Sequence, residues 1–183
     1  MGFKHYKFQP NEYVLVMKNG KVVKQGIGLS FFCNTLNTGM SVVPTVSFDT
    51  FFAFDEVLTS DFQGINIQGD ISYIIRDYEK VAGMIDFSYI SESGYEEKKA
   101  EAKQITNLAK TSVTKFVNAR DVKAVIHSQE ELAAFLTEKM TSNEAITELG
   151  LEVVTVSILA VSPSVETKKA LESATREQIL QQQ

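Results

Sequence analysis

The chain has 183 residues, of which 44% are hydrophobic and 22% charged, and this composition excludes a wholly disordered protein. Its single cysteine, Cys33, excludes a disulfide scaffold and a zinc site built from thiolates. The net charge of −5 argues against general nucleic-acid binding, and no apolar run approaches the ~20 residues that span a membrane.

The first half of the chain has the pattern of β-strands. Asn19-Gly20 separates the apolar runs at 13–17 and 22–23, and an Asn-Gly pair in this place predicts a hairpin with a type I′ turn. Residues 48–57 are rich in aromatic side chains and are expected to be extended. The clearest strand is 65–75, in which apolar residues alternate with mostly polar ones. Its predicted buried face consists of Ile65, Ile67, Gly69, Ile71, Tyr73 and Ile75.

The second half is predicted to be helical, with one further strand. Apolar residues spaced three and four apart predict a helix from about residue 97 to 118. Ser128, with Glu131 three residues later, matches a capping box and predicts a second helix that ends before Gly150. Residues 151–160 alternate as a strand, and one face of it is expected to carry Val154, Val156, Ile158 and Ala160.

The last segment predicts a helix of a different kind. Ser162-Pro163 marks its start, with Ser as the N-cap and Pro in the first turn. Its apolar stripe is thin and cannot bury much against its own domain, which is typical of a helix that finds partners elsewhere. That stripe, the expected oligomerisation surface, consists of Ala170, Leu171, Ala174 and Ile179.

The order of elements predicts an α+β fold with a mostly antiparallel sheet and two packed helices, followed by a C-terminal exit helix. We expect one domain over residues 1–162, with residues 163–183 beginning a helix of coiled-coil type.

Residues that could carry catalysis are scarce. We interpret the two histidines, His5 and His127, as surface residues. The chain contains no phosphate-binding loop, zinc-protease motif or nucleophile elbow. Gly26-Ile27-Gly28 lacks the third glycine of a dinucleotide site and does not open a helix. We therefore predict no catalytic residue, no metal site, no cofactor and no enzymatic activity; an enzyme whose catalytic groups meet only in the folded chain is a third hypothesis.

Several short motifs, taken in order, resemble those of the SPFH or band 7 superfamily, which includes stomatins, prohibitins and flotillins. They are Gly20-Lys21-Val22-Val23 through Gly28-Leu29-Ser30-Phe31, then Thr59-Ser60-Asp61 leading into the alternating strand, and finally Gly150-Leu151-Glu152-Val153-Val154 with Pro163 to Glu177. Two features depart from the family pattern. Ile27-Gly28 stands where Pro-Gly is usual, and the N-terminus has no hydrophobic segment, which makes the chain more similar to flotillins.

The resemblance implies a non-enzymatic scaffold on a membrane surface that organises membrane patches, membrane proteins or membrane proteases. It implies self-association through the domain and a following coiled coil, and a cytoplasmic, peripheral location on the inner face of a membrane. The partners expected are further copies of the chain, the membrane surface and membrane proteases or other membrane proteins, but no nucleic acid. The alternative is a soluble cage or shell built from laterally packed domains of this type.

The N-terminal residues offer a way to reach a membrane without a span. Residues 1–24 contain five lysines and one glutamate, whereas the rest of the chain is acidic. An aromatic and basic segment suits an anionic leaflet, so the hypothetical contacts are Phe3, Lys4, Tyr6, Lys7 and Phe8. The structural alternative is that the phenylalanines cover a sheet while the lysines keep its edge soluble.

Cys33 is a second candidate for membrane attachment. The resemblance to flotillins, some of which are S-acylated near this point of the domain, makes it a candidate acylation site. One acyl chain anchors only marginally, so it would act together with the N-terminal segment. The alternative interpretation is a buried, inert thiol.

Overall fold

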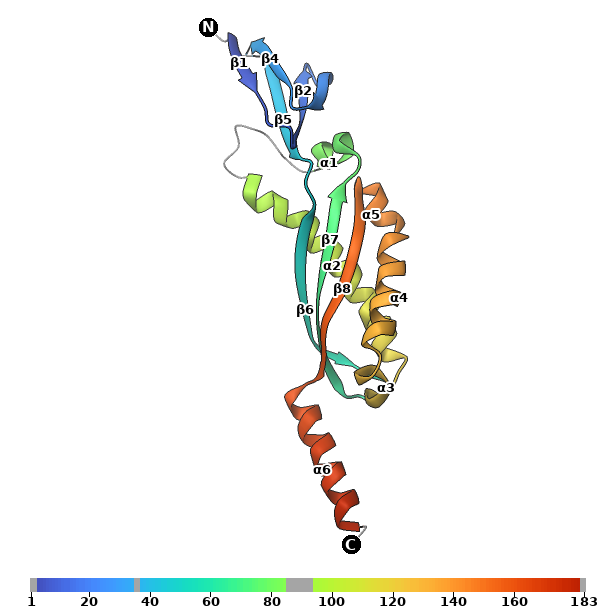
Figure 1. Ribbon diagram of the computed structural model, residues 1–183. Coiled ribbons are helices and arrows are strands. Elements are labelled where there is room, and N and C mark those ends of the chain that lie inside the picture. Colours follow the sequence, from blue (N-terminus) through green and yellow to red (C-terminus); the bar gives the residue numbers. More distant parts are fainter. Residues whose placement is uncertain (1–2, 35–36, 85–93, 182–183) are drawn as a thin grey trace. The chain divides into compact units, whose positions relative to one another are not determined.

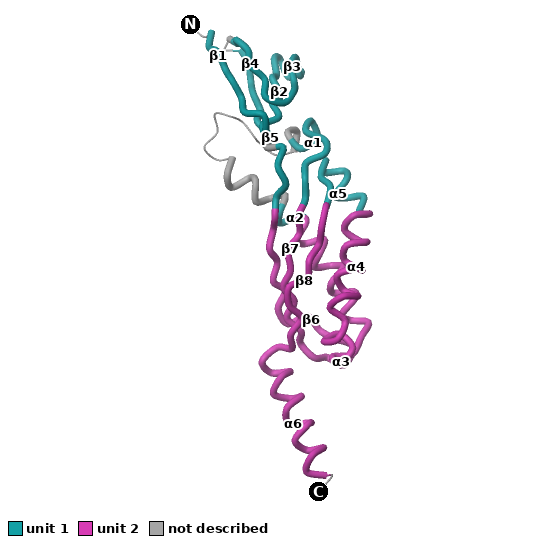
Figure 2. Tube along the Cα trace, viewed as in Figure 1, with its two compact units in different colours: residues 1–48, 73–104, 143–153 teal, residues 49–72, 105–142, 154–183 magenta. Residues whose placement is uncertain are grey.

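A computed structural model describes residues 3–34, 37–84 and 94–181 (Figure 1). The chain divides into two compact units (Figure 2). Unit 1 comprises residues 1–48, 73–104 and 143–153, and unit 2 comprises residues 49–72, 105–142 and 154–183. The described elements are antiparallel strands and helices, which confirms the predicted α+β class.

Unit 1 contains two small antiparallel sheets. In one, β1 (Phe3–Lys7) pairs with β4 (Ser30–Asn34). In the other, β2 (Glu12–Lys18) lies between β3 (Lys21–Ile27) and β5 (Thr38–Pro44). Neither β1 nor β5 was predicted, because neither shows a clean alternation of apolar and polar residues.

The hairpin between β2 and β3 forms as predicted. Asn19 has φ 53° and Gly20 has φ 75°, so both central residues of the two-residue turn occupy the left-handed region that a type I′ turn requires. This turn fixes the pairing of Lys18 with Lys21 at the end of the hairpin.

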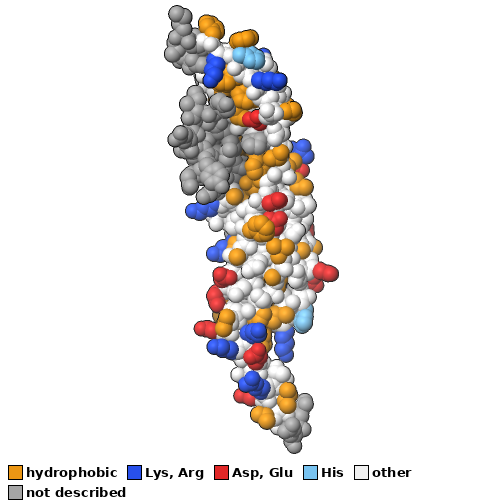
Figure 3. Space-filling model, turned by 60° about the vertical axis from the view of Figure 1, so that its left-hand side comes forward, with side chains coloured by type: hydrophobic (Ala, Val, Ile, Leu, Met, Phe, Trp, Pro, Cys, Tyr) orange, Lys and Arg blue, Asp and Glu red, His pale blue; other side chains and the backbone are white. Residues whose placement is uncertain are grey.

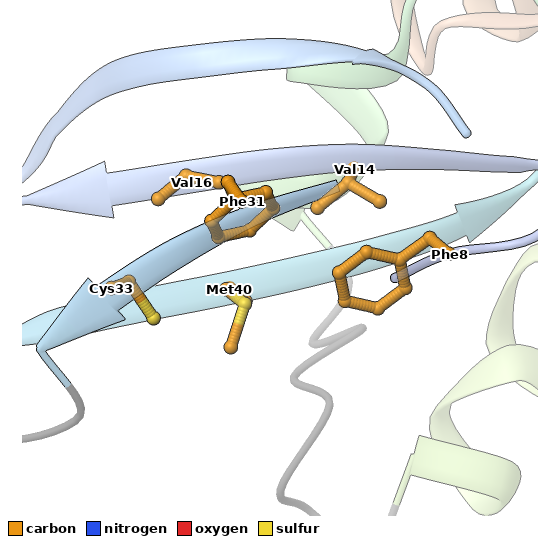
Figure 4. Close-up of a cluster of buried hydrophobic side chains, with 6 residues drawn as sticks. All are labelled: Phe8, Val14, Val16, Phe31, Cys33 and Met40. Atoms are coloured by element: carbon orange, nitrogen blue, oxygen red, sulfur yellow. The ribbon is translucent and has the colours of Figure 1, made fainter. Parts of the chain in front are cut away.

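The two sheets of unit 1 are held together by a cluster of buried side chains, which Figure 4 shows pointing toward one another from β2, β4, β5 and the segment after β1. Each strand contributes alternate residues, as expected for strands with one buried face. The cluster consists of Phe8, Val14, Val16, Phe31, Cys33 and Met40. Burial of a large apolar side chain contributes about 1.5–3 kcal/mol, so the cluster stabilises the packing of the two sheets.

The third sheet has the order β6 (Phe48–Leu58), β7 (Gly64–Ile75), β8 (Leu151–Pro163). A connection of only five residues makes β6 and β7 an antiparallel pair. The backbone N–H of Arg76 donates to the Gly150 carbonyl (2.8 Å) beyond one end of β7, and that of Ser164 donates to Gly64 (2.9 Å) at its other end, so β8 is antiparallel to β7. The predicted buried face of β7 is confirmed, since all six residues named for it are buried.

Helices cover one face of this sheet within unit 2. They are α2 (Gly94–Asn118, from residue 105 on), α3 (Val122–Ile126) and α4 (Gln129–Thr141) (Figures 1 and 2). The predicted stripe of α2 is confirmed: Leu108 is half-buried, and the rest are buried, namely Ile105, Ala109, Val113, Phe116 and Val117. The side chain of Gln129 donates from Nε2 to the Ile158 carbonyl (2.9 Å) and ties α4 to β8.

The helix predicted from Ser128 to the residue before Gly150 is in fact two helices. α4 ends at Thr141, and α5 (Glu144–Glu148) begins after Asn143, whose side chain accepts a hydrogen bond from the Ala145 N–H (2.9 Å). An Asn in extended conformation that caps a new helix cannot also continue the old one. The capping box was wrong as well, because the Ser128 hydroxyl donates back to the Ala124 carbonyl instead of accepting from a helix N–H.

Two predictions about the C-terminal part also need correction. In β8, the adjacent residues Val154 and Thr155 are both exposed, which interrupts the alternation of buried and exposed residues. The buried residues are Leu151 and Val153 before this point and Val156 and Ile158 after it. Val154 therefore does not share the face of Val156.

The helix α6 (Val165–Gln181) is capped by Ser164, whose hydroxyl accepts from the Thr167 N–H (3.3 Å), and not by Ser162, because β8 continues to Pro163.

The end of α5 yields a prediction for stability. Gly150 has φ 81°, and a Cβ placed there would lie 2.8 Å from the Asp77 carbonyl oxygen. Gly150→Ala is expected to lower the free energy of unfolding by about 1–3 kcal/mol, measured by chemical denaturation. Gly39→Ala is the matched control, because no atom lies within 4 Å of a Cβ at Gly39. Equal stabilities for the two variants would contradict the assignment of strain to Gly150.

Candidate functional site

The β1–β4 pair has one buried face and one exposed face. The register opposes Tyr6 to Phe31 and Lys4 to Cys33, and this face is turned toward the buried cluster. Side chains alternate along a strand, so the residues between them point away from the cluster. This second face, called the outer aromatic face below, consists of Phe3, His5, Lys7 and Phe32.

Large apolar rings dominate the outer aromatic face. Phe3 is 80% exposed and Phe32 is 75% exposed. His5 stands opposite Phe32 with its ring centroid 4.6 Å away, and its Nε2 shares a hydrogen bond of 2.9 Å with the Ser30 hydroxyl. Figure 3 shows hydrophobic, lysine and histidine side chains together on the surface of these N-terminal strands. The face is therefore both apolar and cationic.

The structure separates the predicted membrane contacts into two groups. Phe3, Lys4 and Lys7 are exposed, and the Lys4 Nζ lies 5.3 Å from the centroid of the half-buried Tyr6 ring. Phe8 is only 7% exposed because it belongs to the buried cluster, so its assignment to a surface contact was wrong.

Sequence reasoning missed Phe32 as a surface residue. The signal was present in Phe31-Phe32, because two adjacent residues of a strand point to opposite faces and one of the two rings must leave the core. Deciding which ring leaves required the register with β1. Cys33 lies on the inner side, within the buried cluster, in agreement with the buried-thiol interpretation. Its acylation stays a prediction.

The predicted oligomerisation helix is almost entirely exposed. Among the described residues of α6, the one buried side chain is that of Thr167, whose hydroxyl accepts from the Gly64 N–H (3.0 Å). Ala170, Ala174 and Ile179 are exposed and Leu171 is half-buried. Leu180, which the sequence analysis did not name, is exposed as well. The helix thus carries apolar side chains that its own domain does not cover.

Among the described residues, the titratable groups with displaced pKa values do not belong to the outer aromatic face. In unit 1, the hydrogen-bonded ion pair of Arg76 with Glu152 raises the pKa of the guanidinium and lowers that of the carboxylate. In unit 2, burial raises the pKa of Asp70, and the nearby charge of Asp49 adds to this effect. Asp49 accepts a hydrogen bond from Ser72, whereas the buried Oδ1 of Asp70 has no hydrogen-bond partner. Among the described residues, no three potential metal-ligating side chains gather in one place.

The family model of the SPFH domain / Band 7 family matches residues 6–183 of the chain. The chain belongs to the SPFH/Band 7 family. Its members are membrane-associated scaffold-type proteins and are in general non-enzymatic. A comparison with curated proteins gave no significant match. Within residues 3–34, 37–84 and 94–181, no helix combines the length and apolar character needed to cross a bilayer.

Loss of a phenylalanine ring is expected to cost much more stability in the buried cluster than on the outer aromatic face. Phe8→Ala empties part of the buried cluster and is expected to lower the free energy of unfolding by about 3 kcal/mol or more. Phe32→Ala removes an exposed ring and is expected to change it by about 0.5 kcal/mol or less. Urea denaturation of both variants measures the difference. A large loss for Phe32→Ala would show that this face is covered within the folded chain.

The raised pKa of Asp70 predicts that a substitution at this position changes stability in a pH-dependent way. Its pKa is raised on folding, so the protonated side chain favours the folded state, and this contribution is lost as the pH rises through the folded pKa. Asp70→Asn is expected to raise the free energy of unfolding at neutral pH. The gain should shrink toward zero below the ordinary Asp pKa of about 3.9, where Asp70 itself is protonated. Denaturation curves at neutral and acidic pH test this, and a gain that is constant with pH would contradict it.

Proposed function

We propose that this SPFH/Band 7 protein is a non-enzymatic, oligomeric scaffold that docks on the inner, cytoplasmic face of an anionic membrane through its outer aromatic face. The observation that carries the proposal is the pair of exposed rings, Phe3 and Phe32, on a strand pair flanked by lysines. Aromatic rings at the lipid interface and lysines near anionic headgroups are the two elements of a peripheral membrane contact.

The electrostatic part of this contact is modest for one copy. All five lysines of residues 1–24 are exposed, namely Lys4, Lys7, Lys18, Lys21 and Lys24. Each lysine that reaches an anionic surface contributes about 1 kcal/mol. Because only some of them can face the membrane together, a single copy gains a few kcal/mol and binds weakly. Several copies held together bind far better, since avidity adds roughly 10²–10⁴ without new contacts.

Self-association is therefore part of the proposal. The exposed apolar stripe of α6 supports pairing with further copies of the chain, in the manner of a coiled coil that continues the helix. In this arrangement the assembled domains present many outer aromatic faces to one membrane. Organisation of membrane patches, and of membrane proteases or other membrane proteins as clients, is the activity we assign to the assembly.

A second candidate function has its own support in unit 2. Phe51 on β6 is 74% exposed, and Phe62 in the turn between β6 and β7 and Leu159 on β8 are exposed too. Exposed apolar side chains of this size are typical of protein interfaces. Lateral packing through them would suit a soluble cage or shell, which needs no lipid.

Flotation with vesicles distinguishes the two functions. The protein is expected to float with anionic vesicles at low salt, much less at high salt, and little with neutral vesicles. Phe3→Ser/Phe32→Ser is expected to reduce the bound fraction by about tenfold, because the interfacial aromatic residues are lost. Phe51→Ser removes a ring of equal exposure from unit 2 and is the matched control, for which flotation should not change.

Two results would overturn the membrane proposal. One is the absence of flotation with every vesicle while the protein forms large particles in solution, which favours the soluble shell. The other is an equal loss of flotation for Phe51→Ser and for the double variant. Circular dichroism of each variant establishes that the fold is intact.

A further inference from the structure

A pocket of about 440 Å³ opens between the two sheets of unit 1. Its lining residues come from β1 to β5 and the segment that precedes β5. The buried side chains of Val16, Phe31 and Cys33 line it, and these belong to the cluster in Figure 4. Three exposed residues, Val23, Phe3 and Phe32, also line it. The pocket thus reaches from the apolar interior of unit 1 to its proposed membrane contact.

The charged side chains that line the pocket, among the described residues, are positive. Lys18 from β2 and Lys24 from β3 line it, and the Lys24 Nζ lies 5.5 Å from the centroid of the Phe31 ring. Among the described residues that line the pocket, none is acidic. Two cationic groups beside an apolar floor are complementary to a molecule with an anionic head and an apolar tail.

We propose that this pocket binds a single acyl chain of an anionic membrane lipid. The headgroup lies against Lys18 and Lys24, and the chain lies along Val16, Phe31 and Cys33. Pockets that bind small ligands have volumes of about 300–1,000 Å³, and this pocket, at about 440 Å³, lies in the lower half of that range, which favours one chain over a whole two-chain lipid. A membrane as the source of the ligand rests on the proposed function, whereas the pocket and its chemistry do not.

The composition of the pocket is less complementary to simpler ligands. An inorganic anion would contact the lysines but leave the apolar floor unused, and a neutral hydrocarbon would use the floor but leave the lysines unpaired. Binding of an anionic amphiphile uses both sets of residues at once. The ligand thereby links the outer aromatic face to the core of unit 1.

Isothermal titration calorimetry with dodecyl phosphate, kept below its micelle concentration, measures this binding directly. We expect saturable binding with one site per chain, at least tenfold weaker binding of 1-dodecanol, and no binding of inorganic phosphate at the same concentrations. Alkylation of Cys33, the single cysteine, by N-ethylmaleimide locates the ligand. Bound dodecyl phosphate is expected to slow this reaction at least fivefold.

Matched variants test the two lysines and the mouth of the pocket. Lys18→Gln/Lys24→Gln is expected to weaken binding of dodecyl phosphate by about 25-fold, because each lysine near an anionic group contributes about fivefold. Lys21→Gln removes a charge from the same hairpin outside the pocket and should leave binding unchanged. Val23→Glu places a carboxylate at the mouth and should abolish binding, whereas Val22→Glu, outside the lining, should not.

The proposal is overturned if dodecyl phosphate does not bind, if it leaves the alkylation of Cys33 unchanged, or if Lys21→Gln weakens binding as much as the double variant. These outcomes are separate from flotation. Binding of dodecyl phosphate without flotation would retain the pocket and reject the membrane contact, whereas flotation without binding would do the reverse.

Discussion

The packing of the two small sheets of unit 1 against each other is the interaction on which the proposed function depends. Phe8, Phe31 and Met40 meet between the sheets, and their burial sets the orientation of the β1–β4 pair. Once Phe31 points inward, the pleat of the strand turns Phe32 outward, and the register with β1 places His5 opposite it. A core contact therefore determines which aromatic rings face the surroundings.

The same contact explains why a pocket and an exposed face occur together. Large side chains fill the space between the two sheets around Phe8. At the C-terminal end of β2, however, Lys18 lines the pocket. Its charge cannot be buried among apolar side chains without a partner. At that end of β2, a cationic pocket therefore adjoins the buried cluster. In unit 2, by contrast, the helices cover one face of the sheet, and α6 leaves it with its apolar side chains exposed. The proposed lipid contact and the proposed contact with other copies thus lie on different elements of the chain.

Local patterns were sufficient wherever one short-range rule governed the backbone. The type I′ hairpin at Asn19-Gly20, the alternation of β7 and the stripe of α2 are each set by neighbours in sequence, and each is confirmed. The patterns failed where alternatives of similar local energy compete. Asn143 could continue a helix or cap a new one, and Ser162 and Ser164 could each cap α6. Pairing of β8 with β7 decided the second case, because it kept residues 162 and 163 in the strand.

The sequence by itself determined the composition of the candidate site: an aromatic and basic N-terminal segment, a single cysteine and a last helix with a thin apolar stripe, in a chain whose motifs resemble the SPFH superfamily. Only the tertiary structure decided which of those residues are available for binding. It buried Phe8, exposed Phe32 and brought Lys18, Lys24 and Phe31 together around one pocket. The physical reason is that exposure of a strand residue depends on its register and on the sheet that packs against it, and both are set by contacts between segments distant in sequence.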